Sequence, residues 1–329
     1  MPPFQNVFRS GGMNGRGKVN GCGKKMEILK IDTPRMKYGN SHKSFGKMKS
    51  RVYIDNFLYL CNRCNSYSRN KIGNMKFYNR KSELAELRRI RDLSFRDHSR
   101  VSVVTGRRRI GKTSLIMKAV EDMPTVYLFV GRKSEATLCS EFIPVIGQSL
   151  DVFVPMEIRT FRSLFQYLME LSSQKPFNLV IDEFQEFYNI NESVYSDMQN
   201  IWDTYRKKSK MNLIVSGSVY SLMQKIFQNN KEPLFGRADN IIKLSAFDLA
   251  TLKEIIFDYN PDYSNDDLLA LYSFTGGVPK YVELLCDNTE LSVDGMISFM
   301  VRENSSFTDE GKNLLVEEFG KNYATYFSI

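Results

Sequence analysis

The stretch VSVVTGRRRIGKTSLIMKAV, residues 101–120, decides the fold. Its first five residues are rich in β-branched side chains and predict a short buried strand. Gly106 and Gly111 follow, and glycines at these two places allow a tight turn of the backbone. From Lys112 onward the pattern is typical of a helix. A strand, a glycine-rich turn and a helix in this order predict a phosphate-binding loop.

The segment GRRRIGKT matches the pattern G-x-x-x-x-G-K-[ST] at every fixed position. In such a P-loop, consecutive backbone N–H groups and the positive end of the following helix converge on phosphate oxygens. Lys112 can reach the β- and γ-phosphates, and the Thr113 hydroxyl can ligate Mg²⁺. The sequence therefore predicts a nucleoside triphosphate site, with ATP and Mg²⁺ as the expected occupants.

The expected nucleotide contacts extend over the whole loop and one residue beyond it. The three arginines in its middle either add to the attraction for phosphate or form a solvated turn. The residues expected to touch the nucleotide here are Gly106, Arg107, Arg108, Arg109, Ile110, Gly111, Lys112, Thr113 and Ser114.

Two carboxylates follow the buried run FNLVI at 177–181. Asp182 would hold Mg²⁺ through a water together with Thr113, and Glu183 would orient and activate the attacking water. An ordinary strand end with surface acids is the alternative, but a P-loop about 70 residues upstream favours the functional interpretation. A carboxylate base favours hydrolysis over simple binding.

Two further side chains are candidates for catalysis. Ser216 lies in the Ser-Gly-Ser segment after the run MNLIV, where it could bond the γ-phosphate or the lytic water, or belong to an ordinary turn. Arg237 follows the turn PLFG and could stabilise charge in the transition state, within its own subunit or on a neighbour. A structural salt bridge is the alternative for Arg237.

Strand and helix patterns alternate along the middle of the chain, which predicts an α/β fold with a parallel, doubly wound sheet. The runs are apolar rather than alternating, as expected when helices cover both faces of a sheet. After residue 245 only short helices are expected, and they suggest a helical lid. The expected strands are 101–105, 125–130, 177–181, 211–215 and 241–244.

Residues 1–74 differ sharply from the rest. They hold 15 of the 46 Lys and Arg but only 3 of the 37 acids, a net charge of +12, whereas the other 255 residues carry a net of −3. With one compact apolar cluster, this basic extension is expected to be mostly disordered, and it is a candidate contact for nucleic acid. Cys61 and Cys64 lack the further ligands that complete a zinc site.

Bulk properties exclude other classes. No run approaches the roughly 18 apolar residues of a membrane span, and the N-terminus lacks a secretory signal. Five scattered cysteines do not resemble a disulfide scaffold. A soluble, cytoplasmic protein with no membrane partner is expected.

Several motifs together resemble the prokaryotic AAA-type ATPases of the STAND-related group, from about Met75 to the last residue. The resemblance is carried by FYNRKSEL at 77–84, the P-loop, VIDEFQ at 180–185, SGS at 216–218, PLFGR at 233–237 and TGGVPK at 275–280.

The resemblance implies a five-stranded sheet in the order 5-1-4-3-2 and a helical lid. It places Tyr78 and Arg80 near the adenine or ribose, packs Pro279 on the adenine, and makes Ser216 the sensor of the γ-phosphate. Longer members continue into winged-helix and nuclease-like modules. The expected organisation is therefore a basic extension at 1–74, a P-loop ATPase domain at 75–245, a lid at 246–303 and an incomplete winged-helix-like region at 304–329.

The leading functional hypothesis is an ATP-hydrolysing switch or motor. An ATP-gated scaffold with negligible turnover is the main alternative, and a nucleic-acid-binding protein is the third. Binding to nucleic acid would use the basic extension or a C-terminal module beyond this chain. A homo-oligomer or a protein client is a further expected partner.

The change of character at Met75 leads to a separate hypothesis. An amphipathic helix pattern starts soon after this methionine, so we expect Met75 to be the natural start and residues 1–74 to be a translated upstream region. Mass spectrometry of the native protein should then find no peptides from residues 1–70. Abundant peptides from that region would contradict the hypothesis.

Overall fold

The computed structural model describes residues 75–302 and residue 307. Its strands are β1 Arg100–Thr105, β2 Thr125–Phe129, β3 Phe177–Asp182, β4 Met211–Gly217 and β5 Asn240–Lys243. Its helices are α2 Lys81–Arg96, α3 Lys112–Val120, α4 Glu135–Leu150, α5 Phe161–Ser172, η2 Phe184–Glu186, α6 Phe187–Ile190, α7 Ser193–Tyr205, α8 Tyr220–Gln228, α9 Leu249–Tyr259, α10 Asn265–Thr275, α11 Pro279–Asn288 and α12 Val293–Met300. The expected disordered extension, the Cys61 and Cys64 pair, and the region 304–329 apart from Phe307 lie outside the described residues.

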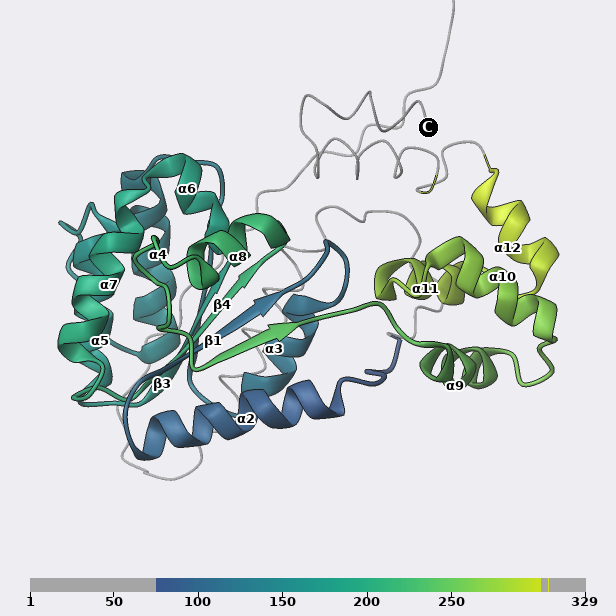
Figure 1. Cartoon of the computed structure of the whole chain (residues 1–329), viewed down its shortest axis with the longest axis horizontal. Helices are drawn as coiled ribbons and strands as arrows, with labels where there is room; N and C mark the ends of the chain where they lie inside the picture. The colour runs from purple at the N-terminus through teal and green to yellow at the C-terminus, as the bar shows by residue number, and fades with distance from the viewer. Residues whose placement is uncertain (1–74, 303–306, 308–329) are drawn as a thin grey trace, which may run out of the picture. The chain divides into compact units, whose positions relative to one another are not determined.

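The five strands form one sheet in the order β2-β3-β4-β1-β5, and all neighbouring pairs are parallel. This is the order 5-1-4-3-2 counted from the other edge, so the expected fold is confirmed. Because the strands are parallel, their carboxyl ends meet at one edge of the sheet. The P-loop follows β1 at that edge (Figure 1).

Each central strand contributes side chains to two separate cores. Val103, Leu213 and Val215 belong to the core shared with α4, α5 and α7, whereas the alternate residues Val104 and Ile214 belong to the core shared with α2 and α3. Helices therefore cover both faces of the sheet, and a side-chain period of two distributes the apolar residues between them.

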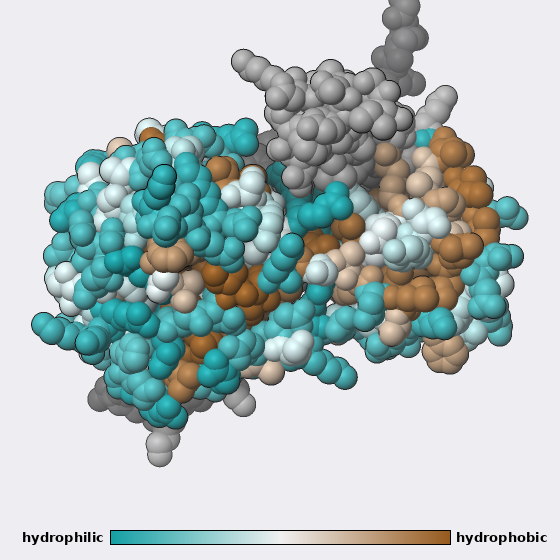
Figure 2. Space-filling view, in the orientation of Figure 1, coloured by the Kyte–Doolittle hydropathy of each residue, from teal (hydrophilic) through white to brown (hydrophobic). Residues whose placement is uncertain are grey.

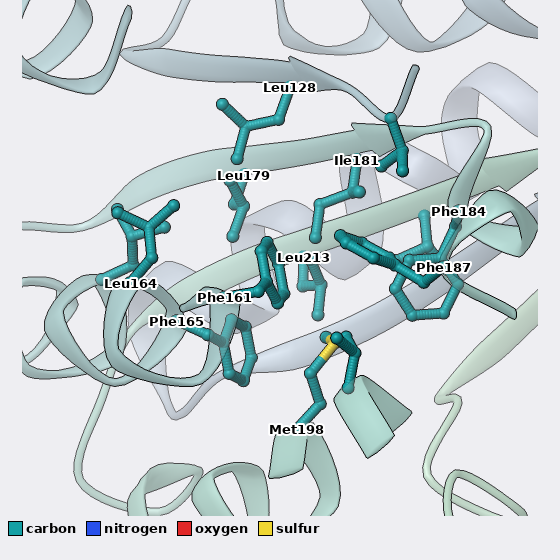
Figure 3. Packing of buried hydrophobic residues seen from close by; sticks show 14 of the residues in the cluster. Leu128, Phe161, Leu164, Phe165, Leu179, Ile181, Phe184, Phe187, Met198 and Leu213 are labelled. Carbon is teal, nitrogen blue, oxygen red and sulfur yellow. The ribbon is translucent and has the colours of Figure 1, made fainter. Parts of the chain in front are cut away.

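Aromatic side chains fill much of the larger core. Phe161 of α5 lies near Leu179 and Leu213 of the sheet in Figure 3. Its ring centroid is 4.6 Å from that of Phe187 on α6, in a tilted arrangement. These large buried rings fix α5 and α6 against the strand that carries the candidate carboxylates.

Several helices of the structure begin with a side-chain cap. Ser134 accepts a hydrogen bond from the Thr137 N–H, and Thr160 accepts one from the Ser163 N–H. A cap satisfies one of the unpaired N–H groups at a helix start, which explains why α4 and α5 begin where they do.

Three short helices of the structure, η2, α6 and α8, are not predicted from the sequence, and several element boundaries differ by one to three residues. Helix α8 was not expected, because its apolar residues follow directly on the turn-forming Ser-Gly-Ser segment. Helix α7 spans Ser193–Tyr205, whereas the apolar pattern of the sequence predicts a helix over residues 194–208. The next segment leads into β4 instead, where the Ser99 N–H donates to the carbonyls of Arg206 and Ser209.

Helices α9 to α12 pack around a core of their own. Leu252, Leu271 and Leu285 are fully buried in it. Tyr78 belongs to the same core although it precedes α2 in the chain. The helical bundle is thus completed by a segment that the expected domain limits assign to the ATPase domain.

The helical bundle also exposes large apolar side chains, which Figure 2 shows as brown areas. Phe257 of α9, Leu269 of α10 and Val301 after α12 are 57%, 61% and 76% exposed. Single exposed apolar residues are normal on protein surfaces, so these assign no partner by themselves. None of the described helices has the length and apolar character needed to cross a membrane.

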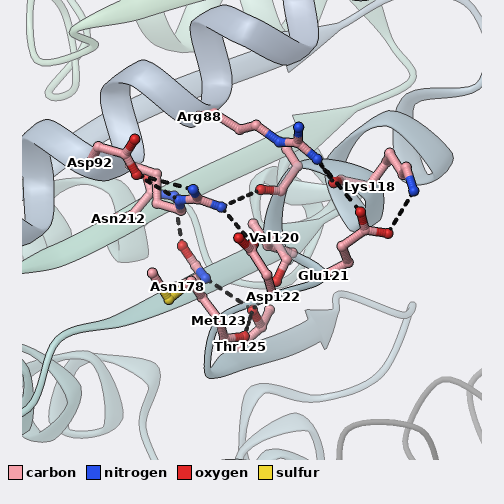
Figure 4. Close-up of polar contacts among 12 residues, drawn as sticks. Arg88, Asp92, Lys118, Val120, Glu121, Asp122, Met123, Thr125, Asn178 and Asn212 are labelled. Atoms are coloured by element: carbon pink, nitrogen blue, oxygen red, sulfur yellow. Dashed lines mark hydrogen bonds and ion pairs between the residues drawn. The ribbon is translucent and has the colours of Figure 1, made fainter. Parts of the chain in front are cut away.

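A buried arginine, Arg91, joins α2 to α3. Between the same two helices, Figure 4 labels Arg88, which donates to the Lys118 carbonyl at 3.1 Å. Arg91 donates through Nη1 to the Ala119 carbonyl at 2.8 Å and to the Asp122 carboxylate at 2.8 Å. The Ala119 carbonyl lies in the last turn of α3, where helical carbonyls lack an intrahelical partner. Arg91 therefore holds the P-loop helix against α2.

We expect Arg91→Met to lower the free energy of unfolding by about 2 kcal/mol, because a charged donor to a buried carbonyl is lost. Arg89→Met is the matched control on the same helix, since Arg89 is exposed and pairs only locally with Glu86. The control should cost clearly less, because solvent screens the exposed ion pair of Arg89 with Glu86. Urea denaturation of the full chain measures both, and equal losses would contradict the role given to Arg91.

Candidate active site

The P-loop backbone adopts conformations that favour glycine. Gly106 has φ 152° and Gly111 has φ 87°. A Cβ at Gly106 would lie 2.8 Å from the Leu244 carbonyl oxygen, so the loop packs directly on the segment after β5. Arg109 has φ 65° without being glycine, which is an uncommon left-handed conformation. The two fixed glycines of the motif are therefore required by the turn itself.

The side chains of the loop divide into exposed and buried groups. Arg107, Arg108, Arg109 and Ser114 are exposed, whereas Ile110 is buried in the core beneath the loop. Ile110 can therefore contact a nucleotide only through its backbone. The arginines remain candidates for contact with phosphate.

Lys112 is buried and folds back onto its own loop. Its Nζ donates to the carbonyls of Gly106 and Arg107 at 2.9 Å and 3.1 Å. Burial lowers the pKa of Lys112, while the carboxylates of Glu183 and Asp182 act in the opposite direction. A phosphate group would offer this ammonium a charged partner in place of two carbonyls.

The Asp182 carboxylate accepts four hydrogen bonds. Its Oδ2 accepts from the Thr113 hydroxyl at 3.0 Å and from the Tyr127 hydroxyl, and its Oδ1 accepts from Ser216 and, at 3.0 Å, from the Glu183 N–H. Burial and the neighbouring Asp182 charge raise the pKa of Tyr127 far above its ordinary value, so Tyr127 is a hydroxyl donor. The carboxylate is thus satisfied although it is buried.

Glu183 lies half-buried beside Asp182, with φ 54° at its backbone. Its Oε2 accepts from the Ser218 hydroxyl at 2.8 Å and from Gln185 Nε2 at 2.5 Å. The two serines of the Ser-Gly-Ser segment therefore serve different carboxylates, Ser216 for Asp182 and Ser218 for Glu183.

The resemblance places Tyr78 and Arg80 near the adenine or ribose. In the structure they contact the helical bundle and the segment that leads into it from β5. Tyr78 donates to Asp258 at 2.7 Å, and the Arg80 guanidinium lies 5.5 Å from the centre of the Phe247 ring and donates to the Ser245 carbonyl. Burial, followed by the Asp258 hydrogen bond, raises the pKa of Tyr78. Tyr78 is therefore a packed residue of the bundle core as well as a candidate nucleotide contact.

The first turn of α11 contacts the P-loop directly. Pro279 occupies the first turn of this helix, and the Lys280 N–H donates to the Arg109 carbonyl at 3.4 Å. The Arg109 guanidinium lies 5.8 Å from the centre of the Tyr281 ring. The bundle and the phosphate loop are thus joined at Arg109.

Arg237 lies near the amino ends of the strands, whereas the P-loop lies at their carboxyl ends. It forms an ion pair with Asp203 at 2.8 Å, and two residues later the Asp239 N–H donates to the Val101 carbonyl at the start of β1. From Val101 to Gly106 the strand rises roughly 16 Å at about 3.3 Å per residue. Arg237 therefore does not reach the P-loop of its own chain, which removes the first of its two expected catalytic roles.

The structure brings together Lys112, Thr113, Asp182, Glu183 and Ser216 at the carboxyl ends of β1, β3 and β4. Three contacts were missed from the sequence: Tyr127, Gln185 and Ser218. Tyr127 lies within the expected strand β2, and only the pairing of β2 with β3 shows that its hydroxyl meets Asp182. Gln185 and Ser218 each lie within two residues of an expected site residue.

The donor set fits Mg²⁺. This ion takes one or two carboxylates together with hydroxyl, water and phosphate oxygens in octahedral geometry. The Thr113 hydroxyl and the Asp182 carboxylate are hydrogen-bonded at 3.0 Å, so one ion can be reached by both. Fold and site together define a P-loop domain for a nucleoside triphosphate.

The chain belongs to the family described as "ATPase domain predominantly from Archaea", whose model matches residues 77–285. A relative, "Uncharacterized protein MJECL04" of Methanocaldococcus jannaschii, is 30% identical over 185 residues, which are 55% of this chain and 38% of the relative. This chain thus spans well under half the length of that relative.

Solved structures share the fold at low sequence identity. The Walker-type ATPase paby2304 of Pyrococcus abyssi has a TM-score of 0.52 at 15% identity, over 80% of this chain and 78% of that one. The Aeropyrum pernix ORC2 protein, described in ADPNP-ADP complexes, has a TM-score of 0.50 at 14% identity, over 77% of this chain and 70% of that one. These likenesses show a shared fold.

Proposed function

We propose that this chain binds ATP with Mg²⁺ and hydrolyses it, acting as an AAA- or STAND-type switch or motor. One observation carries the proposal: the Thr113 hydroxyl meets the Asp182 carboxylate at 3.0 Å, with Glu183 next in the chain. A cation-binding pair beside a further carboxylate is the arrangement that hydrolysis of a nucleoside triphosphate needs.

Each residue then has a defined role. Lys112 exchanges the carbonyls of Gly106 and Arg107 for the β- and γ-phosphates. Thr113 and Asp182 hold Mg²⁺, which neutralises charge on the phosphate oxygens.

Hydrolysis follows at the γ-phosphorus. Glu183 orients the attacking water and receives its proton as the new P–O bond forms and the bond to the β-phosphate oxygen breaks. Ser216 lies near the end of β4 and donates to Asp182 at the end of β3, and it is proposed to sense the γ-phosphate.

The remaining proposed contacts concern the ribose and adenine of the nucleotide. We assign the space near Arg80, Pro279 and Tyr78 to the ribose and adenine, and the helical bundle to a lid within 246–303. Support comes from the contact between the Lys280 N–H and the Arg109 carbonyl, which links the start of α11 to the phosphate loop. The nucleotide complexes of the A. pernix ORC2 protein support a nucleotide as the ligand.

Turnover of ATP by the full chain with Mg²⁺ is the decisive measurement. Lys112→Ala should abolish binding and turnover, because the ammonium for the phosphates is lost. Glu183→Gln should keep binding and lower kcat by at least about 100-fold, because the water loses its base.

Two matched controls separate these roles from general charge changes. Lys118→Ala lies on the same helix, and its partner is the exposed Glu121. Glu186→Gln lies three residues beyond Glu183 and pairs with Arg132. Both controls should retain turnover. Binding without turnover in the unaltered chain would instead indicate a nucleotide-gated scaffold.

Arg237 is proposed to act on the nucleotide of a neighbouring copy, since it does not reach its own P-loop. Arg237→Ala and Glu183→Gln should each be inactive alone. Their equimolar mixture should recover roughly a quarter of the unaltered turnover, because random assembly pairs an intact Glu183 with an intact Arg237 at that frequency.

Arg162→Ala is the control, since it removes a comparable surface ion pair with Asp197 and should leave turnover unchanged. A mixture no more active than its two components would show that Arg237 has no role on a neighbour.

A further inference from the structure

We propose that Gln185 and Ser218 are positioning residues that hold Glu183 for attack by water. Both donate to the same carboxylate oxygen, Oε2, with Gln185 Nε2 at 2.5 Å and Ser218 Oγ at 2.8 Å. Among the described residues no donor to Oε1 is seen, so this second oxygen is left to receive the proton. The inference rests on the proposed hydrolysis and deepens it.

The orientation of the Gln185 amide follows from its partner. An ionised carboxylate only accepts hydrogen bonds, so the nitrogen of the amide must face Glu183. The amide oxygen then points toward Gly217, and a Cβ on that residue would lie 2.4 Å from it. The same Cβ would lie 2.5 Å from Met223 Sδ, so any larger residue at 217 would displace the Gln185 and Met223 side chains.

The buried position of the Gln185 side chain has a cost in stability. The residue is only 1% exposed, and its Oε1 has no hydrogen-bond partner in the described part of the chain. An unpaired buried acceptor destabilises a fold, and an apolar residue of similar shape would remove that cost. The bond from Nε2 to Glu183 is the interaction that an apolar residue could not replace.

The two donors come from different strand ends, which makes the arrangement stiff. Gln185 belongs to η2 after β3, and Ser218 follows β4. These strands pair side by side, with Ile181 opposite Val215. Glu183 has φ 54°, and its carboxylate is held from both neighbouring strands, so its free oxygen has a defined position. Precise placement of a catalytic group is what second partners supply.

The test compares kcat and KM for ATP in the full-length chain. Gln185→Met keeps the side-chain volume without the amide, and kcat should fall roughly 10- to 100-fold, the loss expected when a catalytic group is misplaced by about an ångström. Ser218→Ala should lower kcat in the same direction, and Ser218→Thr, which keeps the hydroxyl, should retain most of it. KM should stay within about twofold in all three, because ground-state binding is unchanged.

Thermal unfolding separates positioning from a structural role. Gln185→Met should not lower Tm, because an unpaired buried acceptor is removed. Gln166→Met is the matched control, since Gln166 Nε2 also donates to a glutamate, Glu170, at 2.9 Å but outside the site. Its kcat should equal that of the unaltered chain.

The outcomes are distinct. If the unaltered chain has no turnover, the proposed function fails and this inference fails with it. If the unaltered chain is active and Glu183→Gln is not, kcat values of Gln185→Met and Ser218→Ala equal to or above the unaltered value would overturn the positioning role alone. A fall in kcat that is matched by a fall in Tm for both variants would overturn it as well.

Discussion

The buried carboxylate of Asp182 is the group on which the arrangement of the site depends. It accepts from Thr113 on α3, Tyr127 on β2, Ser216 on β4 and the N–H of Glu183 after β3. A buried charge without such partners would be costly, so these hydrogen bonds fix α3 and the strands β2, β3 and β4 relative to one another. The P-loop, Glu183 and the two serines then take their places around it.

Much of the fold and of the candidate site could be predicted from the sequence because the deciding patterns are local. The β-branched run before Gly106 and the helix pattern after Lys112 are read within twenty residues, and the apolar run before Asp182 shows a strand buried on both faces. The sheet order was correct for another reason, since it came from a family resemblance. Caps at Ser134 and Thr160 lie where the helices begin.

What could not be predicted depends on neighbours in space. The role of Tyr127 requires the pairing of β2 with β3, and the role of Ser218 requires Glu183 to turn toward β4. Arg237 lies near the amino ends of the strands because the segment that follows it pairs as β5 with β1. No local sequence pattern contains this pairing. Tyr78 packs with helices that begin about 170 residues later in the chain, so its burial is equally nonlocal.

The folded-back lysine of the P-loop has a consequence for affinity. Lys112 already has two oxygen partners in the carbonyls of Gly106 and Arg107, so those carbonyls compete with any incoming phosphate. Binding is therefore an exchange of partners, and only the difference between phosphate and carbonyl contributes to the affinity. A site built in this way releases its ligand more readily than one with an unpaired ammonium would.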